Sequence, residues 1–268
     1  MYPNMLRASS SSPRPGDTID PMAEPARRPQ DAAPAPGSAA WWSARPVRPG
    51  ERGRGRPRRS FENIVSVAAD LVDELGVDGV NMRLLAQRLE TGTATLYRHV
   101  SGKDELMVYV LDSRMGEIVG AYDARPARPR SWREALERIA FAYRAFLDAH
   151  PNLLPLLVGR LPVGPHALTI RERSLAALTE HGFSQALAAR AFTTLLQYVV
   201  GSAVTQAGSP APDEAAAIQD YYRSLGAVHP HVAAAAEALT HTPREAGFVE
   251  GLDIVLDGID RSHRRSAR

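Results

Sequence analysis

Between residues 93 and 103 the chain carries a cluster of polar side chains whose chemistry suits contacts with nucleic acid. The cluster consists of Thr93, Thr95, Tyr97, Arg98, His99 and Lys103. Tyr97 offers a hydroxyl group on a rigid ring to a phosphate, and Lys103 adds an ammonium group to the free amides at a predicted helix start. These two side chains are expected to position the protein on a phosphate backbone. A half-buried core tyrosine is the alternative reading of Tyr97.

The other members of the cluster are expected to read bases. Thr93 and Thr95 lie where a short helix begins, so their side chains reach base edges or thymine methyl groups. Arg98 and His99 suit phosphate or guanine, with an ordinary surface position as the alternative for His99. Together the six side chains predict a surface for double-stranded DNA rather than a catalytic centre.

A second cationic group lies upstream, in a segment rich in arginine, glycine and proline. It contains Arg45, Arg48, Arg52, Arg54, Arg56, Arg58 and Arg59. The run Arg54-Gly55-Arg56-Pro57 resembles the core of an AT-hook, an extended segment that lays arginines into narrow A·T-rich minor grooves. We expect Arg54, Arg56 and Arg58 to contact DNA, either by that insertion or by nonspecific attraction to phosphates. A solvated linker is the third reading.

Charge and proline content set this segment apart from the rest of the 268-residue chain. Residues 1–60 contain eleven arginines and five acidic residues, a formal charge of +6, whereas the whole chain carries +2. They also hold eleven of the 21 prolines. Such a composition buries too little apolar area to offset chain entropy, so residues 1–59 are expected to form a disordered arm. No signal peptide and no membrane span is predicted, which favours a cytoplasmic protein.

The residue types present argue against several classes of enzyme and metal site. The chain has no cysteine, which excludes disulfides, thiolate zinc sites and cysteine nucleophiles. No glycine-rich phosphate loop, GxSxG elbow or HExxH motif occurs in the sequence, and the eight histidines are dispersed. We therefore predict no catalytic residue, no metal and no cofactor.

Three short helices are expected to position the polar cluster. The first begins at the N-cap Ser60 and ends at Gly76, and the second is capped by Asn81. Their apolar stripes are Ile64, Ala68, Leu71, Val72 and Leu75 in the first helix, Met82, Leu85, Ala86 and Leu89 in the second, and Leu96 and Val100 in the third. Residues 60–107 thus show the pattern of a helix-turn-helix domain, whose last helix lies in the major groove of DNA.

The remaining residues, 108–268, are predicted to form a larger all-α domain. A fourth helix begins at Lys103 and continues through Val119. Further helical patterns lie at 132–149, 151–158, 166–181, 184–206, 229–239 and 244–260. A mobile loop is expected at 207–217, and no alternating strand pattern occurs. A helical core of this size beside a DNA reader favours a sensor, a dimerisation domain or both.

Several of these stretches resemble the TetR family of DNA-binding regulators. They are Met82–Leu89, Thr95–Val100 and Lys103–Leu106 in the first part, and His150-Pro151, Gly164-Pro165, Leu178–Phe183 and Phe248–Ile259 in the second. The resemblance spans residues 55–260 and implies a ligand-responsive regulator. Glu90 stands where the family commonly has a left-handed glycine, and Gly92 stands where a capping Ser or Thr is frequent. The cap of the recognition helix is therefore expected to rest on Thr91 or Thr93.

The resemblance also implies a homodimer, because two recognition helices about 34–36 Å apart read a palindrome. The helix at 184–206 and the final helix are expected to form a four-helix interface with their partners. The interface residues expected there are Ala191, Leu195, Val199, Ser202, Phe248, Leu252, Val255, Leu256 and Ile259. The alternative is that these faces pack only within the subunit.

A cavity for a small-molecule effector is expected among the helices of the second domain. The lining residues expected there are Tyr143, Leu147, Leu153, Leu157, Leu175, Thr194, Gln197 and Tyr198, each with a core position as its alternative. Leu156-Leu157 stands near the position of the metal-binding histidine of the tetracycline repressor, and His150 is expected to be structural. These two features favour an apolar or weakly polar effector over a magnesium chelate.

The function that the resemblance implies is a repressor that a small molecule releases from a palindromic operator, with activation as the other direction of regulation. A different class also fits the sequence. In an architectural DNA-binding protein the arginine arm would dominate, and the preference would be for A·T-rich DNA in general. Loss of the arm would abolish binding by such a protein, whereas an operator reader would keep its sequence preference.

Overall fold

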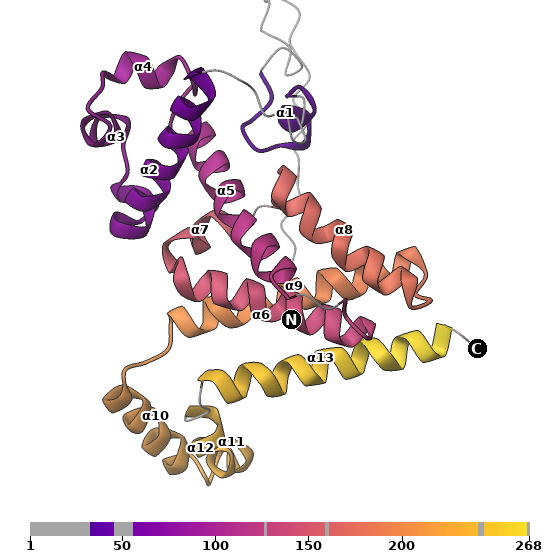
Figure 1. Ribbon diagram of the computed structural model, residues 1–268. Helices are drawn as coiled ribbons and strands as arrows, with labels where there is room; N and C mark the ends of the chain where they lie inside the picture. The colour runs from indigo at the N-terminus through magenta and orange to yellow at the C-terminus, as the bar shows by residue number, and fades with distance from the viewer. Residues whose placement is uncertain (1–32, 46–55, 126–127, 159–160, 241–243, 267–268) are drawn as a thin grey trace, which may run out of the picture. The chain divides into compact units, whose positions relative to one another are not determined.

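The computed structural model describes residues 33–45, 56–125, 128–158, 161–240 and 244–266, and these residues are helical with irregular connections and no strand (Figure 1). The chain divides into two units at Pro34, and everything below concerns the unit formed by residues 35–268. The all-α fold predicted from the sequence is confirmed by this arrangement.

Helices α2 (Arg56–Gly79), α3 (Met82–Arg88) and α4 (Thr93–Tyr97) form the helix-turn-helix part. Their predicted apolar stripes meet in the core, where Leu71, Leu85 and Leu96 are fully buried. The Asn81 cap is confirmed, because its side-chain oxygen accepts hydrogen bonds from the next turn.

Two details of α2 differ from the prediction. The helix begins at Arg56 instead of after Ser60, so the second half of the AT-hook-like run has helical backbone rather than an extended one. Leu75 is 51% exposed and does not join the stripe. Gly76 has a φ of 75°, which interrupts the regular helix directly after Leu75.

The long helix α5 (Lys103–Asp123) leads from the helix-turn-helix part into the larger domain (Figure 1). It packs against α2 on one side and against α6 (Trp132–Ala149) and α8 (Pro165–Glu180) on the other. A short 3-10 turn, η2 (Pro151–Leu153), and α7 (Leu154–Leu157) follow α6. Helix α5 therefore contacts both α2 and the helices of the larger domain.

The end of the chain adds two long helices, α9 (Gln185–Ala207) and α13 (Arg244–Ser266), which pack against each other. Tyr198 donates a hydrogen bond to the carbonyl oxygen of Phe248 over 2.6 Å, and its ring lies against Gly251. A Cβ at Gly251 would lie 2.4 Å from the Tyr198 hydroxyl oxygen, so this glycine permits the close approach of the two helices.

Two segments expected to lack structure contain helices. Within the predicted disordered arm, α1 (Ala39–Ser43) is capped by Ser38 and buries Trp41. Within the predicted loop at 207–217, α10 begins and spans Pro212–Ser224, followed by α11 (Pro230–Ala234) and α12 (Ala236–Thr240) in place of one helix at 229–239. Proline at the first helical position with Asp213 and Glu214 behind it favours a helix start, and the sequence interpretation missed that signal.

Candidate DNA-binding surface and ligand cavity

The recognition helix α4 presents its polar side to solvent. Leu96 and Val100 are buried at 0% and 2% exposure, while Tyr97 is 55% exposed and Arg98 is exposed beside it. The alternative reading of Tyr97 as a core residue is therefore wrong, since its ring lies outside the core. Thr93 is exposed at the start of the same helix.

Two members of the cluster are held in place by neighbours. The imidazole of His99 is half-buried and stacks on Phe61 of α2, with ring centroids 6.2 Å apart. Arg98 donates a hydrogen bond from Nη2 to the Thr95 hydroxyl oxygen over 3.2 Å. The guanidinium of Arg98 therefore lies beside the Thr95 hydroxyl group on the exposed side of α4.

The turn before α4 has an unusual backbone. Glu90 adopts a φ of 52°, which is a left-handed conformation. This conformation was expected, because Glu90 stands where the resembling family commonly has a left-handed glycine. The N-cap is Gly92, and in the part of the chain that the structure describes no side-chain cap hydrogen bond reaches the free amides of α4. The expectation that Thr91 or Thr93 caps this helix is therefore wrong.

Lys103 opens α5 next to the recognition helix, and a buried carboxylate fixes this helix start. Glu105 accepts hydrogen bonds from the backbone amide and the hydroxyl of Ser101, over 2.8 and 2.5 Å, and from Arg45 Nη2 over 2.9 Å. Burial alone would raise the pKa of Glu105, but these donors outweigh burial and lower it. The start of α5 is consequently rigid at the point where Lys103 is expected to meet a phosphate.

A network of charged side chains ties α2 to the larger domain. Arg114 of α5 contacts Asp70 over 2.8 Å and Asp73 over 2.7 Å. His150, at the end of α6, places Nδ1 2.9 Å from Asp73 and Nε2 2.9 Å from Glu117. Both ring nitrogens of His150 are engaged in this way, in agreement with its predicted structural role.

An amide completes the same junction from η2. Asn152 donates from Nδ2 to the backbone carbonyl oxygens of Val72 and Asp73, over 3.1 and 3.0 Å. The carbonyls lie just before the kink at Gly76, where α2 has lost regular helical partners. The DNA-binding helices are thus attached to the larger domain by directional contacts as well as by apolar packing.

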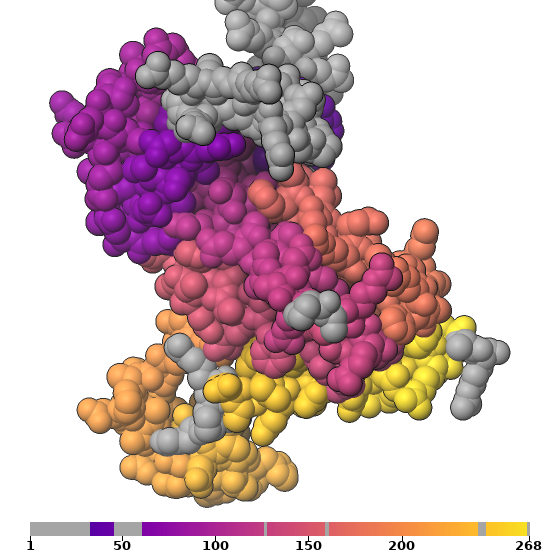
Figure 2. All heavy atoms as spheres, viewed as in Figure 1, coloured from indigo at the N-terminus to yellow at the C-terminus, as the bar shows by residue number. Residues whose placement is uncertain are grey.

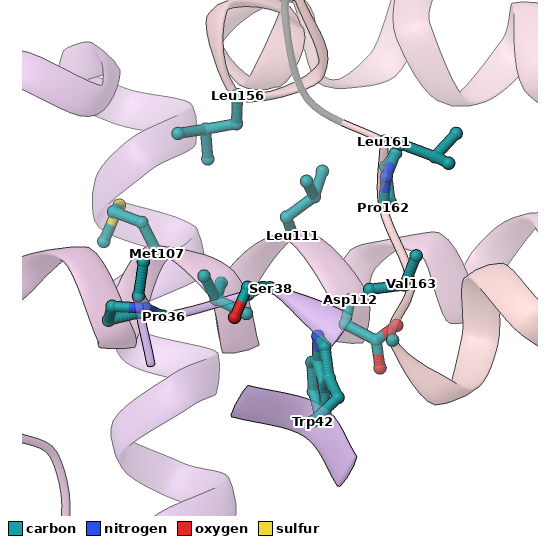
Figure 3. Close-up of a pocket in the computed structure, with 14 residues that line it drawn as sticks. Pro36, Ser38, Trp42, Met107, Leu111, Asp112, Leu156, Leu161, Pro162 and Val163 are labelled. Atoms are coloured by element: carbon teal, nitrogen blue, oxygen red, sulfur yellow. The ribbon is translucent and has the colours of Figure 1, made fainter. Parts of the chain in front are cut away.

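A cavity of about 400 Å³ lies between α5, α7 and the N-terminal segment (Figure 3). The N-terminal segment contributes Ala35–Ser38 and Trp42 to its lining, and α5 contributes Met107, Val108, Leu111 and Asp112. The remaining lining residues are Leu156 of α7 and Leu161–Gly164. None of the eight side chains predicted to line an effector cavity belongs to it.

Asp112 supplies the charged group of this cavity and is held by His166. The backbone amide and Nδ1 of His166 lie 3.2 and 3.0 Å from the two carboxylate oxygens. The side-chain hydrogen bond with Asp112 raises the pKa of His166 above its ordinary 6.5, against the opposing effect of burial.

We predict that the imidazole of His166 titrates above pH 6.5 and that Asp112→Asn lowers its pKa, because the substitution removes the charge that favours the imidazolium form. An NMR titration of the histidine ring protons measures both values. An unchanged His166 pKa in Asp112→Asn would contradict the pairing.

The eight predicted effector residues are distributed over different environments. Tyr143, Leu147, Leu153 and Leu157 are buried in the core, Leu175 and Tyr198 are partly buried, and Thr194 and Gln197 are exposed. Burial raises the pKa of Tyr143 to about 12. The assignment of Thr194 and Gln197 to an internal cavity is corrected, because α9 turns its opposite side to the core.

The residues predicted for the dimer interface lie mainly inside the subunit. Ala191, Leu195, Val199, Phe248, Leu252, Leu256 and Ile259 are buried, and Ser202 and Val255 are partly buried. These side chains fill the contact between α9 and α13 and the core beneath it. The alternative of packing within the subunit is therefore correct for the buried set.

Other sides of the same two helices remain exposed. On α9 they carry Thr194, Gln197, Gly201, Val204 and Thr205, and on α13 Val249 and Ile254. Val204 is 44% and Ile254 70% exposed, and Figure 2 shows part of the α13 surface (yellow) uncovered. Among the described residues, α9 is long and apolar enough to cross a membrane by length and composition, with a third of its most apolar window buried. An interface between subunits produces the same composition.

Comparison with known proteins assigns both parts of the chain. Residues 64–110 match the family of bacterial regulatory proteins called tetR, and residues 125–262 match the tetracyclin repressor-like C-terminal domain. The chain belongs to the TetR family. It is thus a transcriptional regulator with a helix-turn-helix domain and a ligand-binding domain, and not an enzyme.

Individual TetR-family proteins are similar over most of their length. An HTH-type transcriptional regulator of Saccharopolyspora erythraea is 34% identical, over 74% of this chain and 81% of the relative. The HTH-type transcriptional repressor DrrR1 of Streptomyces coeruleorubidus is 29% identical, over 76% and 78%. The structure of ActR of Streptomyces coelicolor in complex with actinorhodin is 30% identical, with a TM-score of 0.69 over 76% of this chain and 97% of ActR.

Proposed function

We propose that this TetR-family protein is a cytoplasmic homodimeric repressor that binds a palindromic operator and leaves it when a small molecule binds the larger domain. The observation that carries the proposal is the exposed polar side of α4, with Tyr97 and Arg98 outside a core closed by Leu96 and Val100. The repressor name of DrrR1 and the complex of ActR with actinorhodin support the same reading.

The exposed sides of α9 and α13 support the dimer. Gly201 lies in the middle of the α9 face, and a Cβ there would meet no described atom within 4 Å apart from its chain neighbours and its own helix backbone. Its lack of a side chain therefore serves no packing within the subunit and leaves room for a partner helix. A second copy placed on this face would cover Val204 and Ile254.

The junction around His150 supports the coupling between ligand and DNA. It links α2 to α5 and to the end of α6, so a shift of these helices changes the separation of the two recognition helices in a dimer. A ligand weakens operator binding only if it prefers the arrangement with the poorer spacing.

The proposal is tested by fluorescence anisotropy with the full chain, a duplex from upstream of its own gene and a scrambled duplex of equal composition. We expect tight binding that prefers the upstream duplex at two salt concentrations. The variant Arg48→Ser/Arg52→Ser/Arg54→Ser should weaken both complexes alike and keep the preference. Equal binding of both duplexes that collapses with salt, or with these substitutions, would instead support the architectural alternative.

Removal of the Tyr97 hydroxyl should weaken operator binding without changing sequence preference. We expect Tyr97→Phe to bind the operator about 30-fold more weakly, because each phosphate hydrogen bond contributes on the order of 1 kcal/mol and the proposed dimer loses two of them. Tyr221→Phe is the control, since Tyr221 is similarly exposed, at 61%, on α10. Equal affinities of the two variants would contradict a phosphate contact by Tyr97.

A further inference from the structure

The segment upstream of the DNA-binding helices, Ala35–Arg45, is docked on α5 by aromatic side chains. Trp41 is 3% exposed, and its ring centroid lies 5.3 Å from that of Tyr109. Trp42 contacts the same tyrosine edge-on at 5.9 Å. Gly37 has a φ of 82° and passes so close to Val108 that a Cβ there would lie 2.9 Å from it. These contacts are too specific for a segment that serves only as a linker.

A charged contact fixes the end of the docked segment. The guanidinium of Arg45 lies 3.8 Å from the ring centroid of Trp41 and bonds the buried carboxylate of Glu105. Glu105 in turn holds Ser101, which lies between the recognition helix and α5. The segment is therefore attached to the first turn of α5, the helix that begins at Lys103.

The docked segment forms one wall of the 400 Å³ cavity (Figure 3). Trp42 and Pro36 lie on the side of the N-terminal segment, Met107 and Leu111 come from α5, and Leu156 lies across from them. A volume of this size accepts a small organic ligand. Without the segment, the cavity would lose the five of its lining residues that precede α2, and Met107 and Leu111 would lose their cover on this side.

The lining also indicates the chemistry of a ligand. Most of the side chains are apolar. The polar ones include Ser38 and Asp112, and Asp112 is the charged one, with a side chain that is only 13% exposed. Its carboxylate accepts hydrogen bonds from His166, and it still has lone pairs free for another donor. The walls thus suit an apolar ring system, and the carboxylate suits an amine or hydroxyl group while it repels an anion.

We propose that this cavity is a binding site for a small apolar molecule bearing an amine or hydroxyl donor, and that its occupancy stabilises the docked Ala35–Arg45 segment. The inference rests on the proposed function in one respect, which is that such a molecule would act as an effector. The site differs from the interior position around Tyr143 and Leu147 that the sequence suggested. Its ligand contacts a segment that precedes the helix-turn-helix part and is bonded to the start of α5.

The test uses two probes with the same ring, 1-aminonaphthalene and 1-naphthoate, and isothermal titration calorimetry with the full chain. We expect the amine to bind at least tenfold more tightly than the carboxylate. Trp42→Ala should weaken binding of the amine at least tenfold, because it opens one wall of the cavity. Leu156→Phe should weaken binding of the amine to a similar extent, because it fills the cavity from the opposite side and leaves the docked segment intact. Trp132→Phe, distant on α6 against Phe183, is the matched control and should bind like the parent protein.

Asp112→Asn should reduce the ratio of the dissociation constants of the two probes at least fivefold. The cavity assignment is overturned if neither probe binds at millimolar concentration, if the two bind equally, or if Leu156→Phe binds the amine as well as the parent does. Operator titrations of the same proteins separate the two claims. If the protein prefers the operator duplex but does not distinguish the two probes, only this inference is overturned. If it distinguishes the two probes but does not prefer the operator duplex, only the proposed function is overturned.

Discussion

Gly201→Arg should turn the dimer into monomers and lower operator affinity by about 100-fold or more, because linked half-sites gain at least that factor over one half-site. Gly201 lies on the exposed side of α9, and a Cβ added there would meet no described atom within 4 Å apart from its chain neighbours and its own helix backbone. An arginine also has a higher helix propensity than glycine, so the subunit should fold normally. Sedimentation velocity and operator anisotropy measure the two effects.

The matched control for this substitution is Gly120→Arg. Gly120 is also an exposed helical glycine, on α5, and a Cβ there meets nothing within 4 Å. The Gly120→Arg protein should remain dimeric, and its operator affinity should be unchanged. A dimeric Gly201→Arg protein with parental affinity would show that the partner does not lie on this side of α9.

Asp73→Ala should lower the free energy of unfolding by about 2 kcal/mol, because it removes one carboxylate contact from Arg114 and one from His150 at the junction of α2 and α5. The value is smaller than for a fully buried pair, since the side chain of Asp73 is 26% exposed and solvent screens the charges. Urea unfolding followed by circular dichroism measures the loss.

Asp70→Ala is the control for the junction. Asp70 contacts the same guanidinium of Arg114, but its side chain is 57% exposed and has no contact with His150. We expect a change within about 0.5 kcal/mol. Equal losses for Asp70→Ala and Asp73→Ala would mean that the His150 contact does not contribute to the attachment of α2.

The parts of the fold that follow from local pattern were predictable. The helix at 132–149 coincides with α6, because Ser131 caps it and its apolar residues recur at helical spacing. The inward direction of Leu96 and Val100 follows from the same period and correctly predicted that Tyr97 faces outward. Periodicity identifies which side of a helix is apolar. This is enough to predict the buried residues where that side packs against a single core.

Periodicity did not identify which partner covers an apolar side. Leu195 and Leu256 were assigned to a partner subunit, yet they pack within the subunit, because α9 has apolar residues on more than one side. For the same reason, Thr194 and Gln197 were assigned to a cavity although α9 exposes them.

Composition concealed the docked N-terminal segment. The average over residues 1–59 is rich in proline and arginine, and that average hides Trp41 and Trp42 behind the N-cap Ser38. Two adjacent tryptophans in such a segment are a signal for docking, because each buries a large apolar area. The cavity beneath them could not be predicted, since its walls come from segments more than 40 residues apart in the chain.

The stoichiometry of the operator complex tests the central claim most directly. Native mass spectrometry of the full chain with a palindromic duplex from upstream of its gene should show two subunits per duplex. The Gly201→Arg protein should show one subunit per duplex. That result would establish paired recognition helices on a two-fold site. A ladder of complexes that grows with duplex length and is indifferent to the palindrome would contradict the account.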